Sequence, residues 1–172
     1  MKNFAITTHD LFWIGKTADD PRDLCLHGYV TVTIGSATLA HTSDITVSAA
    51  ALYLLKTLTD DHRPEDGGLQ LLPCCGHMLI PNNDLTAVDI CGCPNGVDWA
   101  VRHEGGCVRL ILEDGRETLV PFEEYQAEVF RFADRIEAFY NACSPKHLPS
   151  DRFGQDGYTT FWKEWHLRRG NK

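Results

Sequence analysis

The chain has 172 residues, of which 43% are hydrophobic and 23% are charged, and its formal net charge is −8 at pH 7. This length and composition are typical of a single globular domain, and we expect residues 1–172 to form one unit. The negative charge argues against a nucleic-acid-binding protein, which needs a basic surface to displace counterions from phosphates. An acidic surface is instead compatible with a basic protein partner.

No stretch of the chain approaches the roughly 18 apolar residues of a membrane span, so no membrane partner is expected. The start, MKNF, leads into the polar residues TTHD rather than into the apolar core of a signal peptide. These features predict a cytoplasmic protein. The seven cysteines are an odd number whose spacing does not match a secreted disulfide framework, so we expect reduced thiols.

Residues 29–35 alternate between apolar and polar side chains, which predicts a half-buried strand. A shorter strand is expected before it, near Leu11 to Gly15. The period then changes over residues 46–59, where the apolar side chains recur at helical spacing. These are Val47, Ala51, Leu54, Leu55 and Leu58. The polar segment DDHRPEDGG at 60–68 ends this predicted helix.

Three turn signals follow one another, Asn95-Gly96, Gly105-Gly106 and Asp114-Gly115, and the segments between them are long enough to be strands. Such pairs favour two-residue hairpin turns, because they tolerate positive φ angles. We therefore predict a five-stranded antiparallel meander from 69 to 120. Its register places Ile90 opposite Val101, Val101 opposite Leu110, and Leu110 opposite Leu119.

Directly opposed residues share a sheet face, so this register defines a core face. Its predicted members are Val88, Ile90, Trp99, Val101, Val108, Leu110, Leu112 and Leu119, together with Leu69, Leu71, Cys75, His77 and Leu79 from the first strand.

Pro121 and two glutamates predict the start of a long helix, in which apolar residues repeat every three or four positions up to Cys143. A linker over 144–157 and a short helix over 157–168 follow. The sequence as a whole predicts an α+β domain. In it, an antiparallel meander sheet, extended by the N-terminal strands, is covered on one face by helices near 46–59 and 121–143, while the last helix packs at an edge.

The string LLPCCGHMLI, followed by DICGCPNG, suggests a zinc site, because structural zinc takes four sulfur or nitrogen ligands. The predicted register divides these candidates between two faces of the sheet, with Cys75 and His77 on the core side. Cys74, Cys91 and Cys93 would lie on the other side, near Asp98. A site of these three cysteines completed by Asp98 remains an alternative, but side chains two positions apart on a strand stand about 7 Å apart. The spacing therefore favours free thiols, and we expect no cofactor.

An enzyme or small-ligand binder is a second alternative, with a site at the sheet edge formed by His77, His103 and Cys75. Histidine titrates near neutral pH, which suits proton transfer. Histidines at the margin of a core more often bind backbone carbonyls, however, and no nucleophile elbow or phosphate-binding loop occurs in the chain. The dyad Cys25-Leu26-His27 is too common to indicate catalysis by itself. The residues thus favour a non-catalytic protein.

The outer face of the predicted sheet carries the candidate interface. There Arg102 falls opposite Arg109, and Asp98 falls opposite Glu113. Like charges opposite each other destabilise a sheet unless they are solvated or bridged by groups of opposite charge. A partner protein could supply such groups, so we interpret these four residues as a possible binding surface.

Several strings in the C-terminal half carry a resemblance to a known family: CCGH, CPNGVDW, PFEEY, FADRIEAFYNACSPK and GYTTFWKEWHLRR. Between Cys74 and Arg169 the chain resembles a family of small bacterial cytosolic proteins associated with the immunity proteins that accompany secreted polymorphic toxins. The resemblance implies a protein that binds and neutralises a toxin domain. It assigns no catalytic or binding residues.

Overall fold

The N-terminal sheet is built from strands whose buried side chains alternate. β1 (Phe4–Phe12) pairs antiparallel with β2 (His27–Ile34), and β2 also pairs with β3 (Ala37–Ala40) and the two-residue β4 (Ile45–Thr46). In β2 the side chains of Val30, Val32 and Ile34 are buried, as the alternation predicts. The computed structural model describes residues 2–40 and 44–170 of the chain.

The first strand differs from the one expected near Leu11 to Gly15. It begins seven positions earlier, because Phe4 and Ile6 alternate into the core. Beyond Phe12 the chain turns instead, with Trp13 fully buried and Lys16 at a φ of 56°. The backbone N–H of Lys16 donates to the carbonyl of Trp13, which closes this turn.

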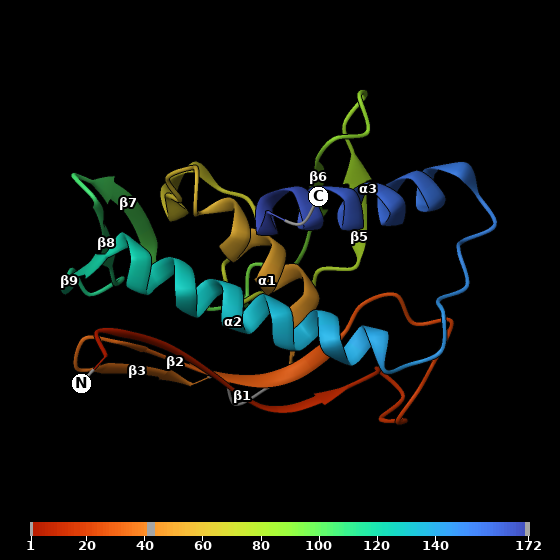
Figure 1. The fold of residues 1–172 in the computed structure, drawn as a ribbon, viewed down its shortest axis with the longest axis horizontal. Coiled ribbons are helices and arrows are strands. Elements are labelled where there is room, and N and C mark those ends of the chain that lie inside the picture. The colour runs from red at the N-terminus through yellow and green to blue at the C-terminus, as the bar shows by residue number, and fades with distance from the viewer. Residues whose placement is uncertain (1, 41–43, 171–172) are drawn as a thin grey trace.

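Three helices follow the predicted order, α1 (Val47–Lys56), α2 (Phe122–Asn141) and α3 (Arg152–Arg169). α1 and α2 contact each other and lie over the same face of the N-terminal sheet, which confirms the predicted packing of helices on one face (Figure 1). α3 lies beyond α1, against the strands β5 (Met78–Pro81) and β6 (Val88–Cys91). No helix in the described part of the chain is long and apolar enough to cross a membrane.

α3 begins five residues before the predicted start at 157. The side chain of Asp151 accepts a hydrogen bond from the backbone N–H of Gly154 and caps the helix. Gly154 and Gly157 suggested a linker in the sequence, but both lie inside the helix. Gly157 is needed there for close packing, because a Cβ at this position would lie 2.4 Å from the carbonyl oxygen of Leu79 in β5.

The predicted five-stranded meander is wrong: two separate antiparallel sheets occupy this part of the chain. β5 pairs only with β6, while β7 (Ala100–Glu104), β8 (Cys107–Ile111) and β9 (Glu117–Pro121) form a sheet of their own. The fold is therefore α+β with antiparallel sheets, but its second half is divided (Figure 1).

The Asn95-Gly96 pair does not form the predicted hairpin, so Ile90 is not opposite Val101. The next residue, Val97, instead exchanges two backbone hydrogen bonds with Leu72, of 2.9 and 3.0 Å. Gly96 permits this approach, since a Cβ there would lie 2.5 Å from the carbonyl oxygen of Leu72. This glycine serves a long-range contact rather than a turn.

The Gly105-Gly106 turn forms as predicted, with positive φ at both glycines, and it places Val101 opposite Leu110. The Asp114-Gly115 turn has one residue more than expected, because the backbone N–H of Leu112 donates to the carbonyl of Arg116. Leu119 consequently lies opposite Arg109 rather than Leu110.

This one-residue shift turns Leu119 outward, where it is 47% exposed, and buries Val120 in its place. The other seven predicted core residues of the later strands are buried: Val88, Ile90, Trp99, Val101, Val108, Leu110 and Leu112. Of the predicted first strand only Met78–Pro81 is a strand, and Leu69 and Leu71 are buried in irregular backbone. Cys75 and Leu79 are half-buried and His77 is exposed, so the predicted core face is wrong for His77.

Candidate functional site

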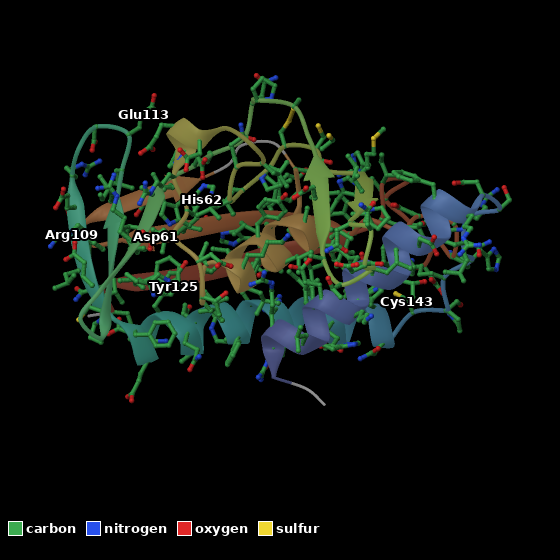
Figure 2. The ribbon with its side chains drawn as sticks, turned by 90° about the horizontal axis from the view of Figure 1, so that it is seen from above. Asp61, His62, Arg109, Glu113, Tyr125 and Cys143 are labelled. Atoms are coloured by element: carbon green, nitrogen blue, oxygen red, sulfur yellow. A yellow bond between two sulfur atoms is a disulfide. The ribbon has the colours of Figure 1, made fainter. Side chains whose placement is uncertain are left out.

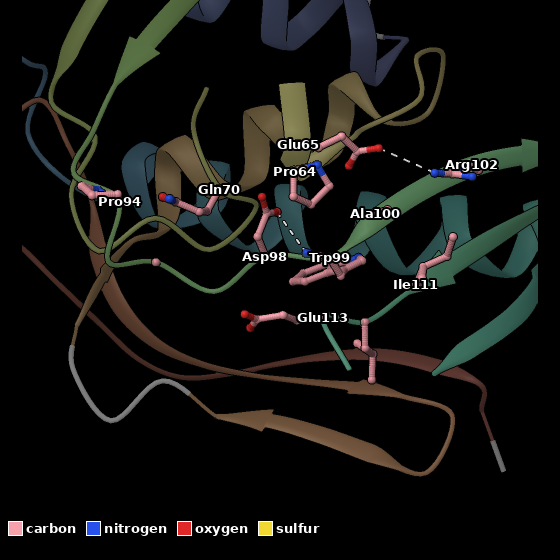
Figure 3. Close-up of a pocket in the computed structure, with 12 residues that line it drawn as sticks. Pro64, Glu65, Gln70, Pro94, Asp98, Trp99, Ala100, Arg102, Ile111 and Glu113 are labelled. Carbon is pink, nitrogen blue, oxygen red and sulfur yellow. Dashed lines mark hydrogen bonds and ion pairs between the residues drawn. The ribbon is translucent and has the colours of Figure 1, made fainter. Parts of the chain in front are cut away.

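A groove of about 550 Å³ opens beside the β7–β8–β9 sheet, and we call it the acidic groove (Figure 3). Its walls come from three segments far apart in the chain. These are the loop with the short 3-10 turn η1 (Pro64–Asp66), the segment 94–102 that leads into β7, and the end of β8. Its lining residues are Pro64, Glu65, Gln70, Pro94, Gly96, Asp98, Trp99, Ala100, Arg102, Ile111, Leu112 and Glu113.

The groove continues past the β8–β9 turn into a second hollow of about 390 Å³. The two hollows share four lining residues, Gly96, Asp98, Leu112 and Glu113. Asp98 and Glu113 thus stand where the two hollows meet. The combined volume falls in the range of sites that hold a small molecule or several residues of an extended peptide.

Asp98 holds the two sides of the groove together. Its Oδ1 atom accepts hydrogen bonds from the Nε2 of His62 at 2.8 Å and from the backbone N–H groups of Leu71 and Trp99 at 3.1 and 3.0 Å. His62 also exchanges two backbone hydrogen bonds of 2.9 Å with Val101 in β7. These contacts fix the loop after α1 to the edge of β7, which gives the groove a rigid wall.

The second oxygen of Asp98 has a different environment. All three hydrogen bonds go to Oδ1, and within residues 2–40 and 44–170 no hydrogen bond to Oδ2 is formed. Asp98 is half-buried and lines the groove. One carboxylate oxygen is therefore available to a ligand while the other maintains the fold.

Glu113 provides a second available carboxylate in the groove lining. It is exposed, and it forms no ion pair with any residue in the described part of the chain. In Figure 3 the Trp99 side chain lies between the Pro64 ring and the Glu113 side chain. Figure 2 shows His62 and Glu113 at the β7–β9 end of the molecule, with Cys143 at the opposite end.

Two buried polar atoms of the groove lining have no hydrogen-bond partner among the described residues. They are Nε1 of Trp99, which is a donor, and Oε1 of Gln70, which is an acceptor. Unpartnered buried polar atoms are uncommon, because each one costs free energy. Both atoms are inaccessible to solvent, so a ligand in the groove could reach them only if the lining side chains moved.

The four residues of the predicted interface lie in different environments. Arg102 lies directly opposite Arg109, as the register predicts. Arg102 lines the groove and pairs with Glu65 at 3.7 Å, whereas Arg109 lies outside it and binds Glu104 and Glu117 at 2.7 Å each. Each arginine is thus paired with carboxylates of the same chain, which offset the repulsion between the two guanidinium groups.

These hydrogen bonds to Glu104 and Glu117 raise the pKa of the Arg109 guanidinium above its ordinary value. The same contact with Arg109 lowers the pKa of Glu104, so both groups stay charged. The Arg109 guanidinium is therefore already paired with two carboxylates of its own chain. Of the four predicted residues, the structure brings Asp98, Arg102 and Glu113 together in the groove.

The alternative site of His77, His103 and Cys75 is not brought together, because β6 does not pair with β7. His103 lies on β7, where its Nε2 atom is 2.9 Å from the carbonyl oxygen of Thr57. His77 precedes β5, and its ring lies 5.2 Å from that of His27. His103 therefore lies in the β7–β8–β9 sheet and His77 next to the β5–β6 sheet, and Figure 1 shows these two sheets apart.

The predicted division of the cysteines between two sheet faces is also wrong, since residues 69–77 form no strand. Cys74 and Cys93 are joined in a disulfide, which corrects the expectation that every cysteine is reduced. Cys75 lies beside this disulfide, while Cys91 is exposed and free. The grouping Cys74, Cys91 and Cys93 proposed from the sequence is thus replaced by Cys74, Cys75 and Cys93.

The residues that the sequence did not reveal are Pro64, Glu65 and Gln70 on one wall and Pro94 on the other. Pro64 and Glu65 belong to the segment interpreted as a loop, Gln70 and Pro94 fall within the predicted meander, and no periodic pattern relates any of them to the groove. Comparison with family models, with curated proteins and with solved structures finds no match to this chain, so the site rests on its own geometry.

Proposed function

We propose that this protein is a non-catalytic binding protein whose acidic groove receives a basic side chain, arginine or lysine, from a protein partner. The observation that carries the proposal is the pair of available carboxylates, Asp98 Oδ2 and Glu113, in the part of the lining that both hollows share. A guanidinium or ammonium group between two carboxylates forms charge-assisted hydrogen bonds, which are the strong ones.

The rest of the groove fits a peptide better than an isolated ion. Pro64, Pro94 and Ile111 supply apolar surface against which the stem of a lysine or arginine can pack. The net charge of −8 would steer a basic partner toward this surface.

A toxin domain is the partner that the family resemblance suggests, and the protein would then act as its immunity protein. Such a role needs only tight binding, which is consistent with a groove that contains no arrangement of nucleophile and base in its described lining. The immunity role belongs to the proposal together with the basic partner.

The experiment compares two charge reversals, Glu113→Lys in the groove and Asp84→Lys in the loop between β5 and β6. Both residues are exposed, and both changes alter the net charge by the same amount. Partners are sought among the products of neighbouring genes, and the dissociation constant of the purified complex is measured by calorimetry at two salt concentrations.

We expect Glu113→Lys to weaken binding by about tenfold or more, and Asp84→Lys by no more than about threefold. Higher salt should weaken the wild-type complex, because the contact is between charges. Equal effects of the two variants would refute the groove as the binding site. The absence of a stable complex with any neighbouring gene product would refute the immunity role.

A further inference from the structure

The sulfur atoms of Cys74, Cys75 and Cys93 lie within 4.8 Å of one another. All three residues are half-buried, so the cluster is near the surface but shielded from bulk water on one side. Its members come from two segments, 74–75 and 93, which approach each other outside any regular strand. None of the three cysteines lines the acidic groove, although Pro94, which follows Cys93, does.

Two glycines allow the close packing around the cluster, Gly92 between the two segments and Gly76 against α1. A Cβ at Gly92 would lie 2.3 Å from the carbonyl oxygen of Cys75, which no side chain permits. A Cβ at Gly76 would lie 3.1 Å from that of Ala49 in α1. The CCG and CGC strings therefore pack backbone against backbone, and this arrangement directs the three thiols to one point.

A backbone hydrogen bond supports the cluster. The N–H of Cys93 donates to the sulfur of Cys75 at 3.0 Å. An N–H group that points at a sulfur atom stabilises its negatively charged thiolate form, and such contacts typically surround metal-bound cysteines. Cys75 is thus held next to the Cys74–Cys93 disulfide in an orientation suited to a ligand.

We propose that, once the Cys74–Cys93 disulfide is reduced, the three thiolates of Cys74, Cys75 and Cys93 bind one Zn²⁺ ion. Zinc–sulfur bonds of about 2.3 Å in a tetrahedron separate the sulfur atoms by roughly 3.8 Å. Sulfur atoms already within 4.8 Å need only short displacements to reach this spacing. Thiolates favour zinc over magnesium or calcium, and the fourth position is left to water or an added ligand.

The disulfide and the zinc site exclude each other, because they use the same sulfur atoms. A dithiol reductant supplies two electrons and two protons to the disulfide, which yields two thiols while the reductant becomes a disulfide. Binding of Zn²⁺ to the three thiols then releases three protons. The site is therefore available only in the reduced protein, so the redox state determines whether zinc binds.

The test is a zinc titration of the reduced and the oxidised full-length chain, monitored by competition with a coloured chelator, with Co²⁺ as a second probe for thiolate coordination. Cys75→Ser is the central variant, because it removes one ligand and leaves the Cys74–Cys93 disulfide intact. Its thermal unfolding in the oxidised state shows whether the fold is preserved. Cys91→Ser is the matched control, since Cys91 is two positions from Cys93 and outside the cluster.

We expect about one equivalent of Zn²⁺ in reduced wild-type protein and in Cys91→Ser, and an affinity at least about tenfold lower in Cys75→Ser. The oxidised wild-type protein should bind less than about a tenth of an equivalent, because two of the three ligands are tied up in the disulfide. The same low value in the reduced protein would overturn the proposal. Equal losses in Cys91→Ser and Cys75→Ser would overturn the assignment of the ligands.

Discussion

The imidazole of His62 and the carboxylate of Asp98 are 36 positions apart in the chain, and their Nε2 and Oδ1 atoms lie 2.8 Å from each other. Their side chains are only 15% and 18% exposed. The contact joins the loop after α1 to the segment that leads into β7. The contact thereby joins two of the segments that line the acidic groove and helps to set its shape.

Replacing Asp98 by asparagine removes the charge that three donors share. We expect Asp98→Asn to lower the free energy of unfolding by about 1–3 kcal/mol, since hydrogen bonds to a charged acceptor are stronger than those to a neutral one. Urea denaturation measures the change. Asp89→Asn on the exposed side of β6 is the control, with an expected change below about 0.5 kcal/mol. Equal stability of the two variants would contradict the structural role of Asp98.

The contacts of Glu128 in α2 lead us to expect that the free energy of unfolding depends on pH. Burial would raise its pKa, but hydrogen bonds from Arg131, from the backbone N–H of Ile6 and from Lys2 outweigh that effect and lower the pKa to about 2. The group is charged in the folded state at pH values where the unfolded chain already binds a proton. Its stabilising contribution is therefore complete above pH 4.5 and is lost as the pH falls toward 2.

The measurement for Glu128 is urea denaturation of wild type and Glu128→Gln between pH 7 and pH 2.5. We expect the variant to be less stable by about 1–3 kcal/mol at pH 7, with a difference that narrows steadily below pH 4.5. Glu123→Gln makes the same chemical change at an exposed position of the same helix and should show a much smaller difference. A difference for Glu128→Gln that stays constant down to pH 2.5 would disprove the role of its ionisation.

A substitution of Gly157 tests how closely α3 packs against β5. A methyl group at this position would meet the carbonyl oxygen of Leu79 at 2.4 Å, so Gly157→Ala must push the helix away from the strand. We expect a loss of about 1–3 kcal/mol by thermal or urea unfolding, despite the better helix propensity of alanine. Gly15→Ala is the control, because its nearest contact would be at 3.9 Å. A neutral or stabilising Gly157→Ala would show that this approach is not tight.

Cys25 and Cys91 should differ in their reaction with iodoacetamide. Burial raises the pKa of the Cys25 thiol to about 12, and the nearby Asp23 carboxylate adds to this rise. At pH 8 only about one molecule in 10,000 then carries the reactive thiolate. We expect mass spectrometry to find Cys91, which is exposed, alkylated first and Cys25 alkylated only after denaturation. Similar rates for both in the folded protein would contradict the burial of Cys25.

The local parts of the fold could be predicted from the sequence because neighbouring residues decide them. The alternation of Val30, Val32 and Ile34 indicates β2, and the apolar repeat after Pro121 indicates α2. The Gly105-Gly106 turn sets the register of β7 and β8, since both of its residues have positive φ angles, which glycine adopts without strain. Each of these features depends on a few residues close together in the chain.

Other features depend on the tertiary structure, because the same residue type can serve either a local turn or a long-range packing contact. Gly96 and Gly157 look like turn or linker residues, but long-range packing against Leu72 and Leu79 requires them. Cys75 and Cys93 meet because 69–77 is irregular rather than a strand, and no local pattern indicates this. In the same way, the sequence predicted an interface that included Asp98 and Glu113, but the groove between them exists only because distant segments pack together. Long-range packing, which local preference does not encode, thus determined both proposed sites.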